Sequence, residues 1–505
     1  MNLAASHRAA DAPGFSAWEA LRNPDASPLP DPLANRAIAD AHLERVLRGR
    51  DLLVQDGAIG TQLQAKGLAA NGSIPDLACL TDPDIVTEVH REYVEAGAEM
   101  VTTNSFGANA LKLGGVASVE EVCAAAVACA KASGARYVAG SMGPLGALLE
   151  PFGEVPFERA YEPFLQQARA LAAAGADVLT IETMSDVREA KAALLAAREA
   201  CDLPVFASVT YGANGRTLFG TPPAAAAAIL SSLGADVLGV NCSLGPRELL
   251  PIARELARAS RCPVAVRPNA GMPRLEEGRA VYDVQPDEFA ECMALMLDAG
   301  VSVMGGCCGT NPAFTRALAQ LAARRGAPAE RPYEPALRIC SAQAVAQATA
   351  DGDGQLEIAA AIDPADEDLL DDVRAGDAEA VADEAMDARD DADAVELDAS
   401  CAGLAPERER ALLAAVVAEL EETAPTPLVI RTDDPAALEA AVRSLAGKPV
   451  AGPARGGTQA LAALLPVAKR YGCAVAVPGA GTEAEAAARL AAEEGIPGED
   501  VVFLD

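Results

Sequence analysis

Three of the twelve cysteines stand where they could share one metal ion. Cys242 directly follows the apolar run DVLGVN (236–241), and Cys307 and Cys308 follow the run VSVMGG (301–306). Because Cys242 and Cys307 are 65 positions apart, they cannot form a local zinc knuckle, and only a fold that joins the two strand ends brings them together. Adjacent strand residues point to opposite faces, so Cys307 and Cys308 converge only in irregular backbone, which nearby glycines permit: Gly305, Gly306 and Gly309.

Three thiolates with one open coordination position are typical of a catalytic zinc site. Zinc lowers the pKa of a bound thiol, so such a site would hold a substrate thiol as a nucleophilic thiolate at neutral pH. From spacing alone, two alternatives stay open: buried cysteines that pack as small hydrophobes, and a redox-active vicinal pair. With only three histidines in the chain, any metal site must use cysteines or carboxylates. We expect the other nine cysteines to serve packing: Cys79, Cys123, Cys129, Cys201, Cys262, Cys292, Cys340, Cys401 and Cys473.

The elements that would position these thiols follow a repeated pattern. Eight short apolar runs alternate with helical stretches, at 52–55, 99–103, 136–140, 177–182, 204–209, 236–241, 263–267 and 301–306. Such alternation predicts a parallel sheet covered by helices on both faces. About 275 residues with eight such units match a (β/α)8 (TIM) barrel, and a doubly wound open sheet is the competing architecture. No GxGxxG follows the first run, which argues against a dinucleotide site.

Polar residues cluster directly after the predicted strands. In a barrel these positions share the C-terminal rim, where active sites lie. A single asparagine at a strand end is more often a turn or capping residue than a ligand, but most of the strand ends carry such a group. The candidates are Asp56, Asn104, Glu182, Asn241 and Asn269, beside the cysteines.

Composition limits the class of protein. The 505 residues are 51% hydrophobic, enough for sizeable cores, and the net charge of −33 argues against nucleic acid or an anionic membrane as a partner. We find no 18-residue apolar stretch and no apolar signal sequence, and we therefore expect a cytoplasmic protein. The expected division is a flexible arm over 1–40, with a short helix around Trp18, a barrel over 41–325 and a linker over 326–355.

The remaining segment, 356–505, is expected to be an incomplete α/β domain. Residues 351–410 hold 21 acidic and 4 basic side chains, which we interpret as a solvated helical surface. At most six further strands follow, at 356–362, 394–399, 427–432, 448–452, 473–478 and 501–505. Six strands resemble a half-barrel and cannot close an eight-stranded barrel.

Several motifs resemble the homocysteine S-methyltransferase family, and most closely the homocysteine-binding modules of cobalamin-dependent methionine synthases. The resemblance spans roughly 41–325, and the pairing of GVNC with GGCC is its most specific element. The motifs are DGAIGTQLQ (56–64), VTTNSFGAN (101–109), GSMGPLG (140–146), ETMSD (182–186), GVNCSLGP (239–246), RPNAGMP (267–273) and GGCCGTNP (305–312).

The resemblance implies a site on the barrel rim. Zinc would be held by Cys242, Cys307 and Cys308, with Asn269 as a candidate fourth ligand when substrate is absent. Glu182 and Asp56 match acidic residues near the substrate amino group, and helix capping or strand-end hydrogen bonding is their alternative role. Backbone N–H groups at 103–105 and 141–143 would bind the substrate carboxylate, which adds Asn104, Ser141 and Met142 to the substrate-binding candidates.

The second half resembles the pterin-binding methyltetrahydrofolate module in its helices but not at its strand ends. RICSAQAV (338–345) is similar to the linker that follows the homocysteine module. Glu396, Asp398, the stretch 431–433 and the stretch 451–457 depart from the family residues that hold the pterin, which argues against folate as a cofactor. No corrinoid-type DxHxxG motif is present, so a methylcobalamin donor would arrive on a separate protein.

The resemblance therefore predicts a zinc-dependent homocysteine S-methyltransferase that forms methionine, with a methylcorrinoid protein as donor. S-methylmethionine, S-adenosylmethionine or a betaine is the alternative donor, and a homocysteine analogue the alternative acceptor. A hypothesis of another class is a non-catalytic sensor or scaffold that binds zinc and homocysteine and docks a corrinoid protein.

Overall fold

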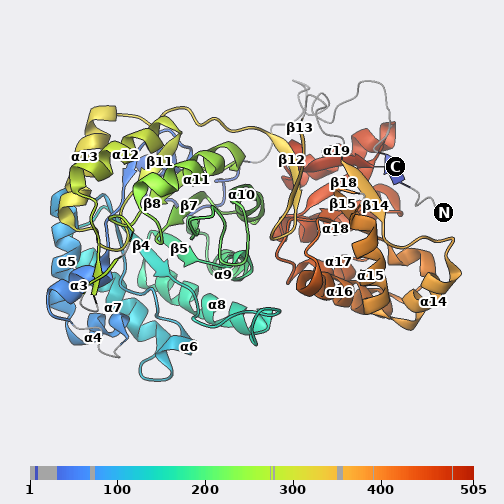
Figure 1. Cartoon of the computed structure of the whole chain (residues 1–505), viewed down its shortest axis with the longest axis horizontal. Coiled ribbons are helices and arrows are strands. Elements are labelled where there is room, and N and C mark those ends of the chain that lie inside the picture. The colour runs from blue at the N-terminus through green and yellow to red at the C-terminus, as the bar shows by residue number, and fades with distance from the viewer. Residues whose placement is uncertain are drawn as a thin grey trace. The chain divides into compact units, whose positions relative to one another are not determined.

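The computed structural model describes residues 6–8, 31–68, 74–272, 274–276, 279–349, 356–390, 392–479 and 481–504. The chain folds as two compact units (Figure 1). Residues 35–333 form the first unit, and residues 334–505 with the N-terminal strand form the second. The predicted helix around Trp18 lies outside the described residues.

The first unit is an eight-stranded parallel barrel. Its sheet order is β2-β11-β8-β7-β6-β5-β4-β3, and a bridge between Gln55 and Met100 joins the first strand to the last. The predicted barrel is confirmed, and the open doubly wound sheet is excluded. The strands are β2 (Leu53–Val54), β3 (Met100–Thr102), β4 (Tyr137–Met142), β5 (Val178–Met184), β6 (Val205–Val209), β7 (Val237–Asn241), β8 (Val264–Arg267) and β11 (Val301–Met304).

Helices follow the strands and surround the barrel, as Figure 1 shows. In α7, for example, the buried residues Val119, Val122, Cys123 and Ala126 repeat at helical spacing, and a Ser118 capping box starts the helix. The long helices are α5 (Pro83–Ala96), α7 (Val119–Ala132), α8 (Phe157–Ala174), α9 (Val187–Ala200), α10 (Pro223–Ser232), α11 (Pro246–Ala259), α12 (Pro286–Asp298) and α13 (Pro312–Arg325). Shorter elements are α2 (Ala41–Leu47), α3 (Ile59–Ala65), η1 (Pro75–Leu77), α4 (Ala78–Thr81), α6 (Ala110–Leu113), β9 (Arg274–Glu276) and β10 (Arg279–Val281).

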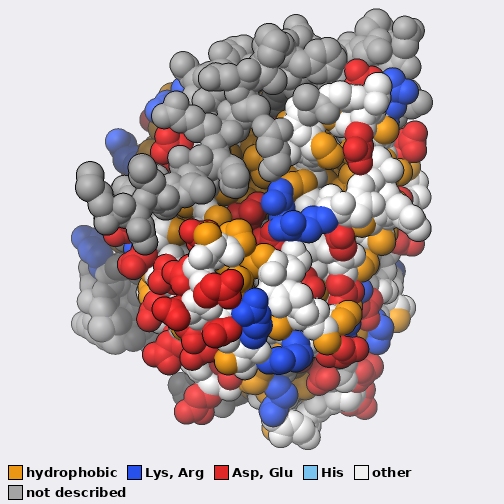
Figure 2. Space-filling view, turned by 90° about the vertical axis from the view of Figure 1, so that its right-hand side faces the viewer, with side chains coloured by type: hydrophobic (Ala, Val, Ile, Leu, Met, Phe, Trp, Pro, Cys, Tyr) orange, Lys and Arg blue, Asp and Glu red, His pale blue; other side chains and the backbone are white. Residues whose placement is uncertain are grey.

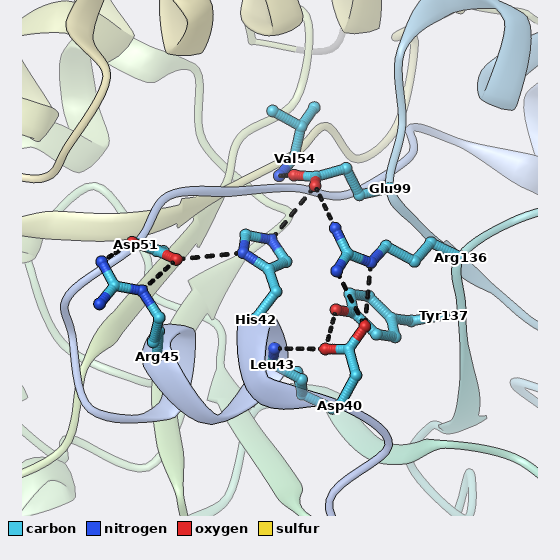
Figure 3. Close-up of polar contacts among 9 residues, drawn as sticks. All are labelled: Asp40, His42, Leu43, Arg45, Asp51, Val54, Glu99, Arg136 and Tyr137. Atoms are coloured by element: carbon cyan, nitrogen blue, oxygen red, sulfur yellow. Dashed lines mark hydrogen bonds and ion pairs between the residues drawn. The ribbon is translucent and has the colours of Figure 1, made fainter.

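A polar network ties α2 to the N-terminal ends of the barrel strands (Figure 3). Asp40 accepts hydrogen bonds from the Tyr137 hydroxyl (2.6 Å) and from Arg136 (2.8 Å). Nε2 of His42 lies 3.2 Å from Glu99, which directly precedes β3. These residues stabilise the end of the barrel opposite the strand ends that carry the cysteines.

The second unit is a half-barrel of six parallel strands, as predicted. A seventh strand, β1 (Ser6–Arg8), pairs antiparallel with β14. The parallel strands are β14 (Glu357–Ala360), β15 (Ala394–Leu397), β16 (Leu428–Ile430), β17 (Val450–Ala451), β18 (Ala474–Pro478) and β19 (Val501–Leu504). The helices are α14 (Glu367–Ala375), α15 (Ala378–Arg389), η2 (Ala399–Ala402), α16 (Pro406–Thr423), α17 (Pro435–Val442), α18 (Gly457–Arg470), α19 (Thr482–Glu494) and η3 (Gly498–Asp500).

Within the predicted linker, the structure contains a hairpin that the sequence analysis missed. Strands β12 (Ala336–Cys340) and β13 (Val345–Thr349) pair antiparallel. Leu337, Ile339 and Ala346 pack into the same buried cluster as residues of the half-barrel sheet. The short strands lie among polar residues, so the sequence pattern did not predict them. Packing against the rest of the unit stabilises them.

Acidic side chains gather on the surface of the second unit (Figure 2). Glu367 and Asp371 of α14 are 81% and 76% exposed, in agreement with a solvated helical surface. Among the helices that the structure describes, we find none with the length and hydrophobicity that a membrane span requires.

Candidate metal centre

The barrel brings the three predicted cysteines together. Cys242 follows β7 and Cys307 and Cys308 follow β11, and β8 alone separates these strands in the sheet. The three sulfur atoms lie within 4.8 Å of one another, and Sγ of Cys242 lies 3.8 Å from Sγ of Cys308. Within the described parts of the chain, no other group of His, Cys, Asp and Glu side chains is arranged to hold a metal ion.

Backbone hydrogen bonds fix the loops that carry these thiols. The N–H of Cys242 donates to the carbonyl of Arg267 (3.1 Å), and the N–H of Cys307 donates to that of Pro268 (2.7 Å). The carbonyl of Cys308 accepts from Ala270 (3.0 Å). The segment 267–270 after β8 therefore holds both cysteine loops.

The backbone is strained at this rim. In the described parts of the chain, the non-glycine residues with positive φ are Thr183 (63°), Cys242 (64°) and Ser243 (57°). Such conformations cost of order 1–3 kcal/mol each and are typical of functional sites. Gly309 has φ 79°, which confirms the irregular backbone predicted beside Cys308.

Without a bound cation, the surroundings of the three thiols raise their pKa values. A hydrogen bond to Cys307 lowers the pKa of Cys242, but a hydrogen bond to Cys308 and burial outweigh it and raise the pKa to about 11. The hydrogen bond with Cys242, together with burial, raises the pKa of Cys307 to about 12. A divalent cation would reverse this balance, because it favours the thiolate form.

The geometry of the thiols fits zinc. With Zn–S bonds of about 2.3 Å, tetrahedral coordination places two sulfur ligands about 3.8 Å apart, and this is the distance between Cys242 and Cys308. Asn269 adds an oxygen donor on the same loop. Its side chain is buried, and its amide oxygen has no hydrogen-bond partner among the described residues. An unpaired buried acceptor costs about 1–3 kcal/mol, which supports a ligand-binding role.

A buried ion pair lies at the same rim. Glu182 accepts a hydrogen bond from the Ser141 hydroxyl (2.5 Å), and its other oxygen lies 3.0 Å from the guanidinium of Arg267. The side chains of Glu182 and Arg267 are each 7% exposed. The sequence analysis did not identify Arg267 as a site residue. Its position at the end of a buried strand could have indicated this role, because a buried charge needs a partner.

The family model for homocysteine S-methyltransferases matches residues 53–322, which span the barrel. The chain belongs to the homocysteine S-methyltransferase family. The prediction of a methyltransferase enzyme is thereby confirmed.

Two methionine synthases and one solved structure are similar to this chain. Methionine synthase of Mycobacterium tuberculosis (strain ATCC 25618 / H37Rv) is 37% identical over 327 residues, which cover 60% of this chain and 27% of that protein. Methionine synthase of Mycobacterium leprae (strain TN) is 37% identical over 313 residues, 58% of this chain and 26% of that protein. The chain thus spans about a quarter of the length of these relatives. The metallated homocysteine methyltransferase MmuM from Escherichia coli is 25% identical, with a TM-score of 0.47, over 55% of this chain and 99% of that chain.

Two of the substrate-binding residues predicted from the family resemblance already have polar partners within the protein. The carboxylate of Asp56 is fully buried and accepts hydrogen bonds from the backbone N–H (2.7 Å) and the hydroxyl (2.9 Å) of Thr102. Burial raises its pKa to about 7, against the opposing effects of Arg267 and Thr102. These contacts favour the alternative of strand-end hydrogen bonding for Asp56. Asn104 donates to the carbonyl of Pro75 (2.9 Å) and contacts the sulfur of Cys79 (3.6 Å).

The backbone donors proposed for the substrate carboxylate are also largely engaged. Thr103 and Ser105 donate their N–H groups to Ala139 and Thr103, respectively. Ser141 donates its N–H to the Thr103 hydroxyl, and Gly143 donates to Phe106. Met142 is completely buried. A carboxylate bound here would have to use other donors or displace these bonds.

Proposed function

We propose that the barrel transfers a methyl group to the sulfur of homocysteine and forms methionine, with zinc held by Cys242, Cys307 and Cys308. The observation that carries the proposal is the cluster of three sulfurs within 4.8 Å on the rim of a homocysteine S-methyltransferase-family barrel. In the reaction, the C–S bond forms as the bond between methyl and donor breaks, and the electron pair of that bond stays with the donor.

When bound, zinc would supply positive charge that keeps a substrate thiol deprotonated at neutral pH. The side chains around it would orient the substrate. Glu182 offers its carboxylate to the substrate ammonium, and Arg267 and Ser141 hold that carboxylate in place. The amide oxygen of Asn269, which has no hydrogen-bond partner among the described residues, has two proposed roles. It would bind zinc as a fourth ligand in the absence of homocysteine, or accept a hydrogen bond from the substrate.

We propose a methylcorrinoid protein as the donor. The similarity to two methionine synthases supports this choice over S-methylmethionine, S-adenosylmethionine or a betaine. Folate is not expected at the strand ends of the second unit, because the side chains there pair with one another. Arg431 lies 3.5 Å from Glu396, and Arg455 pairs with Asp398.

Two measurements test the proposal. The first is the zinc content of the protein, and the second is methionine formation from homocysteine with each of these four donor classes. We expect about one zinc per chain and turnover with methylcorrinoid protein. Cys308→Ala should lose both zinc and turnover, whereas Cys401→Ala in the second unit should lose neither. Turnover by zinc-free protein, or unchanged turnover in Cys308→Ala, would contradict the proposal. Homocysteine binding without turnover for any donor would favour the sensor hypothesis.

A further inference from the structure

Strand β5 is irregular at the residue proposed to bind the substrate ammonium. It pairs in register with β6 up to Ile181, and the pairing resumes with a shift at Met184. Glu182 and Thr183 therefore stand opposite the single residue Ser208, which is the pattern of a β-bulge. A bulge re-aims a side chain, and this one has a backbone cost, because Thr183 has a φ of 63°. Contacts from outside the strand must offset that cost.

The side chain of Asn241 supplies such contacts. Asn241 ends β7, and β6 alone separates β7 from β5 in the sheet. Its amide oxygen accepts the N–H of Thr183 (2.8 Å), and its amide nitrogen donates to the Thr183 hydroxyl (2.7 Å). Because a backbone N–H can only donate, the oxygen of the amide must face this N–H and the nitrogen must face the hydroxyl. Asn241 is fully buried, so water does not compete for these bonds.

The same amide reaches the candidate metal centre. Its nitrogen lies 3.8 Å from Sγ of Cys307, within hydrogen-bond range of sulfur. In the sheet, β8 alone separates β7 from β11, the strand that Cys307 follows. An asparagine amide has two N–H bonds, so one can serve Thr183 and the other Cys307. A single buried side chain thus contacts both the bulge that carries Glu182 and one of the three proposed zinc ligands.

We propose that Asn241 is a positioning residue, which aims the Glu182 carboxylate at the substrate ammonium and orients Cys307 for zinc. Groups that hydrogen-bond to a metal ligand fix its orientation and contribute to metal affinity. The amide cannot move toward one partner without leaving the other, so it sets the distance between the metal and the ammonium site. A homocysteine with its sulfur on zinc and its ammonium on Glu182 spans this distance. The inference rests on the proposed function, because it assumes that homocysteine binds in this way.

The test compares the binding of two thiols by the zinc-loaded full chain, measured by calorimetry. 4-Mercaptobutanoate is homocysteine without its amino group, so the ratio of the two affinities isolates the ammonium contact. Asn241→Ala should lower this ratio about tenfold, which is the scale of two lost hydrogen bonds. Its zinc affinity, measured by competition with a chelator, should also fall about tenfold. A purely structural role would weaken the binding of both thiols equally and leave the ratio unchanged.

Two further variants serve as controls. Asn109 is also a fully buried asparagine, and it caps α6 by accepting the N–H of Lys112 (3.0 Å). Asn109→Ala should lower stability but leave the affinity ratio and the zinc affinity unchanged. In a Glu182→Gln protein, the further change Asn241→Ala should not alter the ratio, because no carboxylate remains to be aimed.

Thr183→Val tests the proposal if Asn241→Ala does not fold. Valine keeps the branched shape and the backbone N–H of threonine and removes its hydroxyl. This variant should still bind zinc and should lower the affinity ratio about threefold, the scale of one lost hydrogen bond.

An unchanged ratio in zinc-loaded Asn241→Ala, or in Thr183→Val if only that variant folds, would overturn the aiming of Glu182. Unchanged zinc affinity in Asn241→Ala would overturn the role at Cys307. A failure of the proposed function would look different, because it would appear in the wild type. That protein would bind no zinc, or would bind homocysteine no more tightly than 4-mercaptobutanoate.

Discussion

The guanidinium of Arg267 lies 3.0 Å from the carboxylate of Glu182, although two strands separate β8 from β5 in the sheet. The two side chains meet because residues that point into a closed barrel face one another across its interior. Both are almost completely buried, so each charge depends on the other to offset its desolvation. This pair links the loop that holds the cysteines to the carboxylate proposed to bind the substrate ammonium.

Removal of Arg267 should therefore weaken both the fold and substrate binding. We expect Arg267→Met to destabilise the barrel by about 3–5 kcal/mol, because it leaves the Glu182 carboxylate buried without its cation. Urea unfolding measures this loss. The double variant Arg267→Met/Glu182→Gln should recover part of the stability but not the affinity for homocysteine. A double variant no more stable than Arg267→Met would show that the pair does not act as a unit.

His90 should make the barrel sensitive to acid. Its ring is fully buried, neither ring nitrogen has a hydrogen-bond partner among the described residues, and burial lowers its pKa from 6.5 to about 4. Folding favours the neutral ring, so its contribution to stability is complete above pH 6.5 and is lost as the pH falls through 4. The loss amounts to about 3 kcal/mol.

Chemical denaturation between pH 4 and pH 7 measures this effect. His90→Met should flatten the acid side of the stability profile. If stability falls with pH equally steeply in His90→Met and in the wild type, other groups cause the acid sensitivity.

Zinc removal should destabilise the first unit alone. A ligand that binds only the folded state stabilises it by about 4 kcal/mol at a free concentration a thousandfold above its dissociation constant. We therefore expect a chelator with a reductant to lower the melting temperature of the barrel and leave the second unit unchanged. Cys308→Ala should melt at the same temperature with and without the chelator. Calorimetry that shows no chelator effect on the wild type would contradict a zinc site in the folded barrel.

The second unit depends on a different buried pair. Nζ of Lys448 lies 2.5 Å from Asp500, and each side chain is 3% exposed. Lys448→Met should destabilise this unit by about 3–5 kcal/mol, because it removes the cation beside the buried Asp500 carboxylate. The exposed Lys469 provides the control, since Lys469→Met should change stability by less than about 0.5 kcal/mol. Zinc content of Lys448→Met should equal that of the wild type, and a loss of zinc would mean that the two units do not fold independently.

Much of the barrel was predictable because its signals are local. Buried parallel strands read as short apolar runs, and the eight runs correspond to the eight observed strands. The cysteines were predictable as a set because each follows such a run, and a barrel places all strand ends on one rim. The hairpin β12–β13 was not predictable in this way, since its short strands are stabilised by packing against the half-barrel rather than by their own pattern.

The strands, the rim and the three thiols follow from local sequence, because residue type and spacing along one strand decide which groups emerge at its end. The partners of those groups depend on the three-dimensional fold. The fold hydrogen-bonds Asp56 to Thr102, pairs Glu182 with Arg267 and places the amide of Asn241 beside the sulfur of Cys307. Such contacts join segments far apart in the chain, and a buried polar group bonds to whatever donor or acceptor the fold brings within reach.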